Sequence, residues 1–305
     1  GALLIRHNPR LISIPDRWGV STSPVHDFFK PRREVSIKSV ISHVVQLARE
    51  TGASIKEGMV DRMVRHLPES TVRRLGIFSH GVDSVQVHRD EPVFDGQFSN
   101  QCYQDAVEEA FRDFRSKAES DGRWDPKGET VLTEDWARII MHLPYAFQAK
   151  RMFPAVFAYE RRGSASWADV EAEIGLPPSI EDFDDTPDGQ AEHNKALDGY
   201  RRVISKTEAY RDFHAERIEK GQRASSLIGN QYTGSIFLAM MSTFESDYEA
   251  DSPLDGRLFG LCGYGSGAKA KVFEGSVSNR WREVVASWNL FERMAGRMAI
   301  DQITY

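Results

Sequence analysis

One amphipathic helix constrains the fold more than any other feature of the sequence. Residues 94–119 read FDGQFSNQCYQDAVEEAFRDFRSKAE, with acids and arginines opposite an apolar stripe. The stripe residues recur at helical spacing: Val107, Ala110, Phe111 and Phe114. We expect Ser99 or Asn100 to cap this helix. The segment therefore predicts a long helix with one buried face.

Composition bounds the class of protein. The 305 residues are 40% hydrophobic and 28% charged, which is typical of a globular chain, and no run is long enough to cross a membrane. A net charge of -6 offers no general basic surface for nucleic acid. The two cysteines, Cys102 and Cys262, exclude a disulfide scaffold and a cysteine-rich zinc site. They suit a reducing compartment, so we expect a cytoplasmic protein.

The first 92 residues differ from the rest. Apolar segments at 2–5 and 11–14 predict two short strands, and the chain opens directly in the first, so we expect it to start inside a larger fold. Residues 37–47 have helical spacing. Residues 34–92 contain four of the nine histidines: His43, His66, His80 and His88. Their spacing fits no metal-ligand template, and we expect surface histidines without a metal.

The later chain alternates helical and extended patterns. Residues 135–142 form a short apolar element that stops before Pro144, and the next helix is expected to be interrupted at Pro154. Residues 175–195 are predicted to form an acidic surface loop. The remaining predictions are a charged helix or helix pair at 196–221, a buried helix at 235–244, a strand, Gly-rich turn and strand at 257–277, and an amphipathic helix at 281–300.

Three stretches contain residues suited to chemistry: MHLPYAFQAKR, IGNQYTGS and GYGSGAKAKVFEG. His142 ends a regular element, where an imidazole can act as a base or donate to a carbonyl, although a lone histidine beside apolar residues is more often structural. Asn230 can cap the following helix or aim its amide at a carbonyl oxygen.

The third stretch contains alternating glycines around Tyr264 and Ser266. Such a pattern serves an ordinary hairpin or a close approach to a ligand. It matches neither a P-loop, because Lys269 is out of frame, nor a nucleophile elbow. Ser266 is therefore not expected to be a nucleophile.

Taken in order, HLPY, GNQYTGS and YGSG resemble the C-terminal half of 3-hydroxy-3-methylglutaryl-CoA synthase, of the thiolase superfamily. HDFFKP and FDGQFSNQCYQDA resemble two earlier blocks, and the last block is most similar to bacterial members. The resemblance covers residues 1–33 and 93–305. It implies an α/β thiolase-like fold, layered α-β-α-β-α, of which this chain holds mainly the C-terminal half.

The resemblance also implies an acyltransferase reaction. The family condenses acetyl-CoA with acetoacetyl-CoA by a Claisen-type step, using a cysteine nucleophile and a glutamate general acid/base. By motif, His142, Asn230 and Ser266 bind and polarise the acceptor. Asp27 supports the site, and Tyr145, Tyr232, Tyr264 and Gly265 line it. No cofactor or metal is expected beyond the coenzyme A thioesters themselves.

The sequence departs from the family in three ways. Phe147 replaces a lysine near the coenzyme A phosphates, and Lys150 and Arg151 either supply that charge or are solvated surface residues. Residues 34–92 have no family counterpart and are an inserted subdomain, a partner surface or an anomaly of the gene. Neither cysteine fits the nucleophile, since Cys102 matches another family position and Cys262 is predicted to be core.

These observations predict three domains and several partners. Residues 1–33 would end the N-terminal thiolase-like half, 34–92 would be the insert, and 93–305 would be the C-terminal half. We expect a missing or separate N-terminal half carrying the Cys and Glu, a homodimer of the complete protein, and a place in the mevalonate pathway of isoprenoid biosynthesis. The alternatives are a polyketide β-branching synthase acting on acyl carrier protein and a non-catalytic thiolase-like subunit.

Overall fold

The computed structural model describes residues 4–54, 56, 58–59, 62, 84–89, 91–125 and 131–300. Two compact units divide the chain. Unit 1 consists of Gly1–Val25 and Asn100–Tyr305, and unit 2 of His26–Ser99. The helix α4 begins in unit 2 and continues through unit 1.

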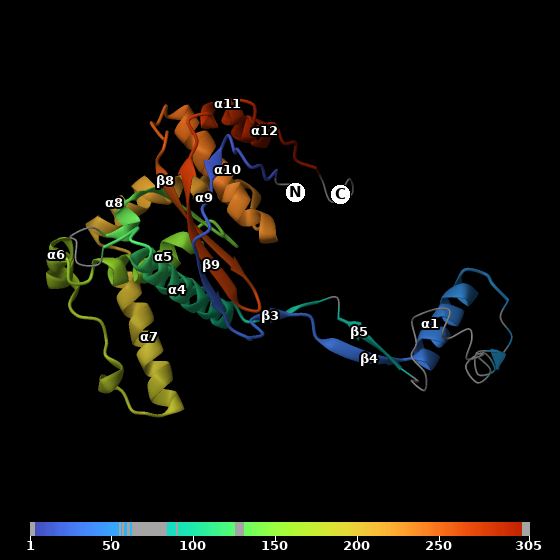
Figure 1. The fold of residues 1–305 in the computed structure, drawn as a ribbon. Coiled ribbons are helices and arrows are strands. Elements are labelled where there is room, and N and C mark those ends of the chain that lie inside the picture. The colour runs from blue at the N-terminus through green and yellow to red at the C-terminus, as the bar shows by residue number, and fades with distance from the viewer. Residues whose placement is uncertain are drawn as a thin grey trace. The chain divides into compact units, whose positions relative to one another are not determined.

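A mixed β-sheet forms the centre of unit 1 (Figure 1). Its strand order is β1 (Ile12–Ser13), β9 (Lys269–Val277), β8 (Leu258–Gly265) and β7 (Trp136–Met141), and β2 (Trp18–Thr22) also pairs with β9. Only the β7–β8 pair is parallel. The hairpin β8–β9 confirms the predicted strand, Gly-rich turn and strand.

Helices surround this sheet. The longer ones are α4 (Gly96–Ser120), α5 (Gln148–Arg161), α6 (Ala165–Ile174), α7 (Pro187–Ile204), α8 (Glu208–Arg217), α9 (Glu219–Ile228) and α10 (Ser235–Glu249). The shorter ones are α11 (Trp281–Val285), α12 (Leu290–Ala295) and the 3-10 turns η1 (Leu132–Glu134), η2 (Ile180–Asp182) and η3 (Tyr232–Gly234).

Two helices cover opposite faces of the sheet. A Cβ added to Gly19 of β2 would lie 2.5 Å from Phe114 Cβ of α4, so only glycine permits this approach. A Cβ added to Gly263 of β8 would instead meet Ile236 of α10 at 3.7 Å. Gly19 pairs with Val272, which pairs with Cys262, so Gly19 and Cys262 point to the same face of the sheet. Gly263 is the next residue after Cys262 and therefore points to the opposite face. Unit 1 is thus a helix–sheet–helix sandwich.

The apolar stripe of α4 is confirmed by burial. Its four members are at most 3% exposed: Val107, Ala110, Phe111 and Phe114. The predicted cap is wrong, because α4 begins at Gly96 rather than after Ser99 or Asn100. The Asp95 carboxylate accepts hydrogen bonds from the first backbone N–H groups instead, at 2.9 and 3.0 Å.

Helix α5 is continuous through Pro154, which corrects the predicted interruption. Proline lacks an N–H, so the carbonyl of Lys150, four residues earlier, loses its helical partner. The Tyr210 hydroxyl donates to that carbonyl at 3.2 Å. A side chain from α8 therefore replaces the missing backbone bond, and the buried helix continues.

Three other boundaries differ from the predictions. The acidic loop is shorter, since α7 begins at Pro187 with the Thr186 hydroxyl accepting from Gly189 N–H at 3.1 Å. The C-terminal helix is two short helices, separated near Asn289, whose φ is +50°. At the N-terminus, residues 4–5 lie outside any strand and 2–3 lie outside the described residues. Strand β1 confirms the second predicted strand, and β2 was not predicted.

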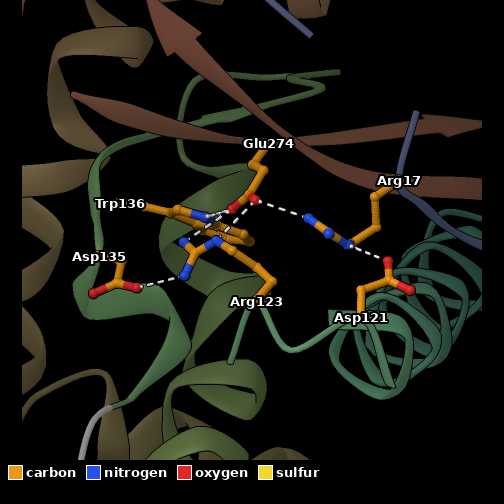
Figure 2. Close-up of polar contacts among 6 residues, drawn as sticks. All are labelled: Arg17, Asp121, Arg123, Asp135, Trp136 and Glu274. Atoms are coloured by element: carbon orange, nitrogen blue, oxygen red, sulfur yellow. Dashed lines mark hydrogen bonds and ion pairs between the residues drawn. The ribbon is translucent and has the colours of Figure 1, made fainter. Parts of the chain in front are cut away.

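A buried carboxylate joins distant parts of unit 1. Glu274 of β9 is 3% exposed and accepts from Arg17, from Trp136 Nε1 at 3.1 Å, and from Arg123 at 3.0 and 3.2 Å (Figure 2). Arg17 also binds Asp121, at 2.9 Å. Opposite charges and hydrogen bonds thus satisfy the buried Glu274, and the network ties the N-terminal segment to β7, β9 and the end of α4.

Unit 2 contains two short antiparallel pairs and one described helix with assigned bounds. Strand β3 (Phe28–Phe29) pairs with β6 (Val93–Phe94), and β4 (Arg32–Ser36) pairs with β5 (Ser84–His88). Helix α1 (Ile37–Glu50) confirms the predicted helix and is capped by the Ser36 hydroxyl.

Of the four histidines between residues 34 and 92, the structure describes His43 and His88. His66 and His80 lie outside the described residues. Among the residues that are described, no cluster of His, Cys, Asp and Glu is arranged for a metal ion, and no helix is both long and apolar enough to span a membrane.

Candidate acceptor-binding site

His142 lies one residue beyond the carboxyl end of β7. Its backbone N–H donates to the carbonyl of Cys262 on β8 at 2.9 Å, extending the parallel pairing by one bond. Leu143 is buried behind it, and Pro144 prevents the strand from continuing. The His142 side chain is 9% exposed. The regular strand therefore ends one residue before the imidazole.

Two tyrosines enclose His142. The ring of Tyr103, from α4, lies edge-on at 6.2 Å between centroids, and the ring of Tyr264, from β8, lies at 6.5 Å. These two tyrosine rings are themselves 4.5 Å apart. The Tyr103 hydroxyl donates to the backbone carbonyl of His142 at 2.7 Å. We call Tyr103, His142 and Tyr264 the aromatic cluster.

Burial sets the protonation of the cluster. It lowers the pKa of the His142 imidazole from 6.5 to about 4, so this group is neutral at neutral pH. A neutral imidazole has one N–H to donate and one nitrogen to accept a proton. Burial also raises the pKa of Tyr103 well above 10, which keeps its hydroxyl a donor.

Cys262 is unsuited to attack a thioester. Cys262 is fully buried in the middle of β8, and burial raises the pKa of its thiol to about 12. This confirms the prediction that Cys262 is core. Cys102 is also buried, on α4.

The residues after the histidine reach the start of α5. The Arg151 guanidinium donates to the Tyr145 hydroxyl at 3.0 Å, so these two predicted site residues are coupled. The Lys150 side chain is exposed on the same helix, and Phe147 is 65% exposed. The region thus presents two cations and one exposed aromatic ring.

Asn230 stabilises the turn before α10 and does not cap that helix, whose N-cap is Gly234. Its Oδ1 accepts from the Tyr232 N–H at 2.7 Å and from the Ser235 hydroxyl at 3.1 Å, which fixes the turn before α10. This use of the oxygen leaves the side-chain NH₂ as the group available to a ligand carbonyl. Asn230 and Tyr232 are both exposed.

Ser266 and Gly265 lie at the β8–β9 turn. Gly265 pairs with Lys269, so Ser266, Gly267 and Ala268 form the connection. Gly267 has a φ of +105°, which favours glycine. Ser266 is exposed.

The topology brings most of the predicted residues to one end of the sheet. His142 follows the carboxyl end of β7, and Ser266 follows the carboxyl end of β8, which runs parallel to β7. Ile236, in the first turn of α10, lies beside Gly263 of β8, so the turn that contains Asn230 and precedes α10 is at the same end. Ligands in α/β sheets bind beyond these strand ends. Asp27 belongs to unit 2, where it is 1% exposed and accepts from the Ser99 hydroxyl at 3.3 Å.

Three polar residues on α4 and α5 make contacts that the sequence does not predict. Tyr103 is the principal one, and its only sequence signal was the block NQCYQDA. The other two are Gln148 and Asn100, whose side chains form a 3.3 Å hydrogen bond between the starts of α5 and α4. Contacts between helices this far apart in sequence are not visible in local patterns.

A cavity of about 320 Å³ lies elsewhere. Its lining includes Glu134, Arg161 and Arg217, which precede β7 or lie on α5 and α8. It is therefore at the amino end of β7, away from His142. Arg161 is engaged by Glu134 at 3.3 Å and Arg217 by the Glu134 carbonyl at 3.0 Å, so this cavity is not the predicted acceptor site.

Known proteins that resemble this chain belong to one family. Residues 86–303 match the family model described as hydroxymethylglutaryl-coenzyme A synthase C terminal. A hydroxymethylglutaryl-CoA synthase of Haloferax volcanii is 28% identical over 219 residues, which are 72% of this chain and 46% of the relative. One of Saccharomyces cerevisiae is 24% identical over 213 residues, 68% of this chain and 40% of the relative. The likeness of the last block to bacterial members stays a prediction.

A solved structure, of MvaS in complex with 3-hydroxy-3-methylglutaryl coenzyme A, matches 97% of this chain and 50% of its own, with a TM-score of 0.59 and 21% identity. This confirms the thiolase-like fold. The chain spans less than half the length of the two relatives named above. It belongs to the hydroxymethylglutaryl-CoA synthase family and matches that family's C-terminal part.

Proposed function

We propose that this chain supplies the acceptor-binding half of a hydroxymethylglutaryl-CoA synthase, an acyltransferase that condenses acetyl-CoA with acetoacetyl-CoA. The observation that carries the proposal is a buried, neutral His142 at the carboxyl end of β7. A histidine in that state can donate a hydrogen bond to a ketone without placing a full charge beside it.

The proposed chemistry places negative charge on the acceptor oxygen. When an acetyl carbanion attacks the ketone of acetoacetyl-CoA, the carbonyl oxygen becomes an alkoxide. Donors already in place stabilise that charge without reorganising. In this proposal His142 donates from its imidazole, Asn230 from its side-chain amide and Ser266 from its hydroxyl. Tyr145, Tyr232, Tyr264 and Gly265 line the same pocket, with Asp27 supporting it.

Coenzyme A recognition would fall to the start of α5. Phe147 stands where the family often has lysine, and Lys150 and Arg151 follow within about one helical turn. Arg151 is held by Tyr145, which restricts its guanidinium and reduces the entropy lost on binding a phosphate. We propose that Arg151, with Lys150, contacts the coenzyme A phosphates.

The acylating half would come from outside this chain. The unreactive state of Cys262 and the burial of Cys102 support a nucleophilic cysteine and a catalytic glutamate on an N-terminal thiolase-like half. Apolar side chains around the α9–α10 junction are exposed and offer contact surface: Leu227, Ile228, Tyr232 and Phe237. The complete protein would be a cytoplasmic homodimer of the mevalonate pathway.

The domain assignment is also a proposal. Residues 1–33 would complete the N-terminal half and 93–305 would form the C-terminal half. Residues 34–92 would be an insert, which is supported by their place inside unit 2 and almost entirely outside the family match at 86–303.

Ligand binding tests the proposal directly. Titration calorimetry of the 305-residue chain should detect acetoacetyl-CoA, with at least tenfold weaker binding in His142→Ala. His193→Ala is the control for loss of an imidazole, because His193 lies on α7 and contacts Phe183 and the Pro178 carbonyl. Equal affinity in the His142 variant would refute the role of His142. Binding of acetoacetyl groups only on acyl carrier protein would favour the polyketide alternative.

A further inference from the structure

We propose that Tyr103 is a positioning residue for His142. The proposal rests on the proposed function, since it concerns the residue that would bind the acceptor. Tyr103 would not touch substrate itself, because it is 2% exposed. It would act by holding the backbone and ring of His142 in one orientation.

The first contact fixes the backbone. The registered β7–β8 ladder ends at Met141 and Cys262, so His142 lies just beyond regular pairing. Its N–H is held by the Cys262 carbonyl at 2.9 Å, and its own carbonyl by the Tyr103 hydroxyl at 2.7 Å. The backbone N–H of His142 is therefore held by the sheet, and its backbone carbonyl is held by α4.

The second contact fixes the ring. Tyr103 meets the imidazole edge-on, with an interplanar angle of 86°, a favoured arrangement for aromatic pairs. It also contacts Tyr264, with ring centroids 4.5 Å apart. One side chain thus packs against both neighbours in the aromatic cluster, and a shift of Tyr103 would move both.

The third element is the rigidity of the support. Tyr103 belongs to α4, whose buried stripe packs against β2 closely enough to require Gly19. Side chains held by regular elements keep catalytic groups in place better than loop residues do. Small displacements matter, since misplacing a group by about 1 Å can cost about 100-fold in rate.

The experiment compares Tyr103→Phe with wild type in the 305-residue chain. This change removes the hydroxyl and keeps the ring. Tyr200→Phe is the control for the same chemical change. The Tyr200 hydroxyl, on α7, donates to the Gly175 carbonyl at the end of α6, at 3.0 Å. Three quantities are measured: acetoacetyl-CoA affinity, the melting temperature, and the NMR signal of [¹³Cε1]-labelled His142, assigned with His142→Asn.

We expect Tyr103→Phe to weaken acetoacetyl-CoA binding at least fivefold and to shift or broaden the His142 signal, while the protein stays folded at the assay temperature. Tyr200→Phe should do neither. An unchanged His142 signal in Tyr103→Phe would overturn the proposal, and so would unchanged affinity in a chain that binds. If wild type binds no acetoacetyl-CoA, the proposed function fails, but the ligand-free His142 signal still decides whether Tyr103 positions it.

Discussion

At the scale of single residues, burial gives His142 two properties at once. It removes the imidazole from water, which lowers its pKa to about 4, and it brings the ring against two tyrosines. The first property keeps the group neutral, and the second limits its motion. A surface histidine would have neither, so the end of β7 is well suited to an electrophilic donor.

This burial predicts acid sensitivity. The folded pKa of about 4 is below the unfolded value of 6.5, so the unfolded chain binds the extra proton as pH falls between these values. The free energy of unfolding should therefore decrease from pH 6.5 to 4, by about 3 kcal/mol for this group. His214 should add a similar decrease over the same window.

Urea unfolding at pH 7, 5.5 and 4 checks this. Each of the variants His142→Asn and His214→Asn should lower the number of protons taken up on unfolding by about one, which reduces the slope of the unfolding free energy against pH. A pH dependence identical to wild type in both variants would show that neither imidazole is buried in its neutral form.

At the scale of elements, sequence patterns predict a helix or turn correctly where local residues determine it, and fail where a residue far along the chain does. The α4 stripe and the β8–β9 hairpin were predictable, because local periodicity and glycines report burial and turns directly. The continuity of α5 was not predictable, because Tyr210, 60 residues from Lys150, supplies the bond that Pro154 removes. Likewise His142 was found within a motif, but its contacts with Tyr103 depend on the packing of α4.

The α5 arrangement predicts a coupled pair of substitutions. Tyr210→Phe should destabilise the protein by about 1 kcal/mol, since it removes the partner of the Lys150 carbonyl in a partly buried contact. In the Pro154→Ala background the helix regains its own N–H, and the same substitution should cost clearly less. A double-mutant cycle by urea unfolding measures the difference. Equal costs in both backgrounds would show that the hydroxyl does not replace the helical bond.

At the scale of the whole molecule, the chain has a sheet tied together by buried charges and matches the C-terminal part of its family. The Glu274 network joins the N-terminal segment, α4, β7 and β9 into unit 1 (Figure 2). Yet both cysteines are buried, and the chain spans less than half of the relatives from Haloferax volcanii and Saccharomyces cerevisiae. Fold and acceptor site can therefore be argued from this chain, and we propose that acylation uses residues outside it.

The most direct test of the central claim is a condensation assay in which the proposed N-terminal half is supplied. The part of the Haloferax volcanii relative that lies outside its match to this chain is added with acetyl-CoA and acetoacetyl-CoA, and coenzyme A release is measured. We predict release only when both chains are present, with at least a 100-fold loss in His142→Ala. Release that is unchanged by His142→Ala would contradict the account.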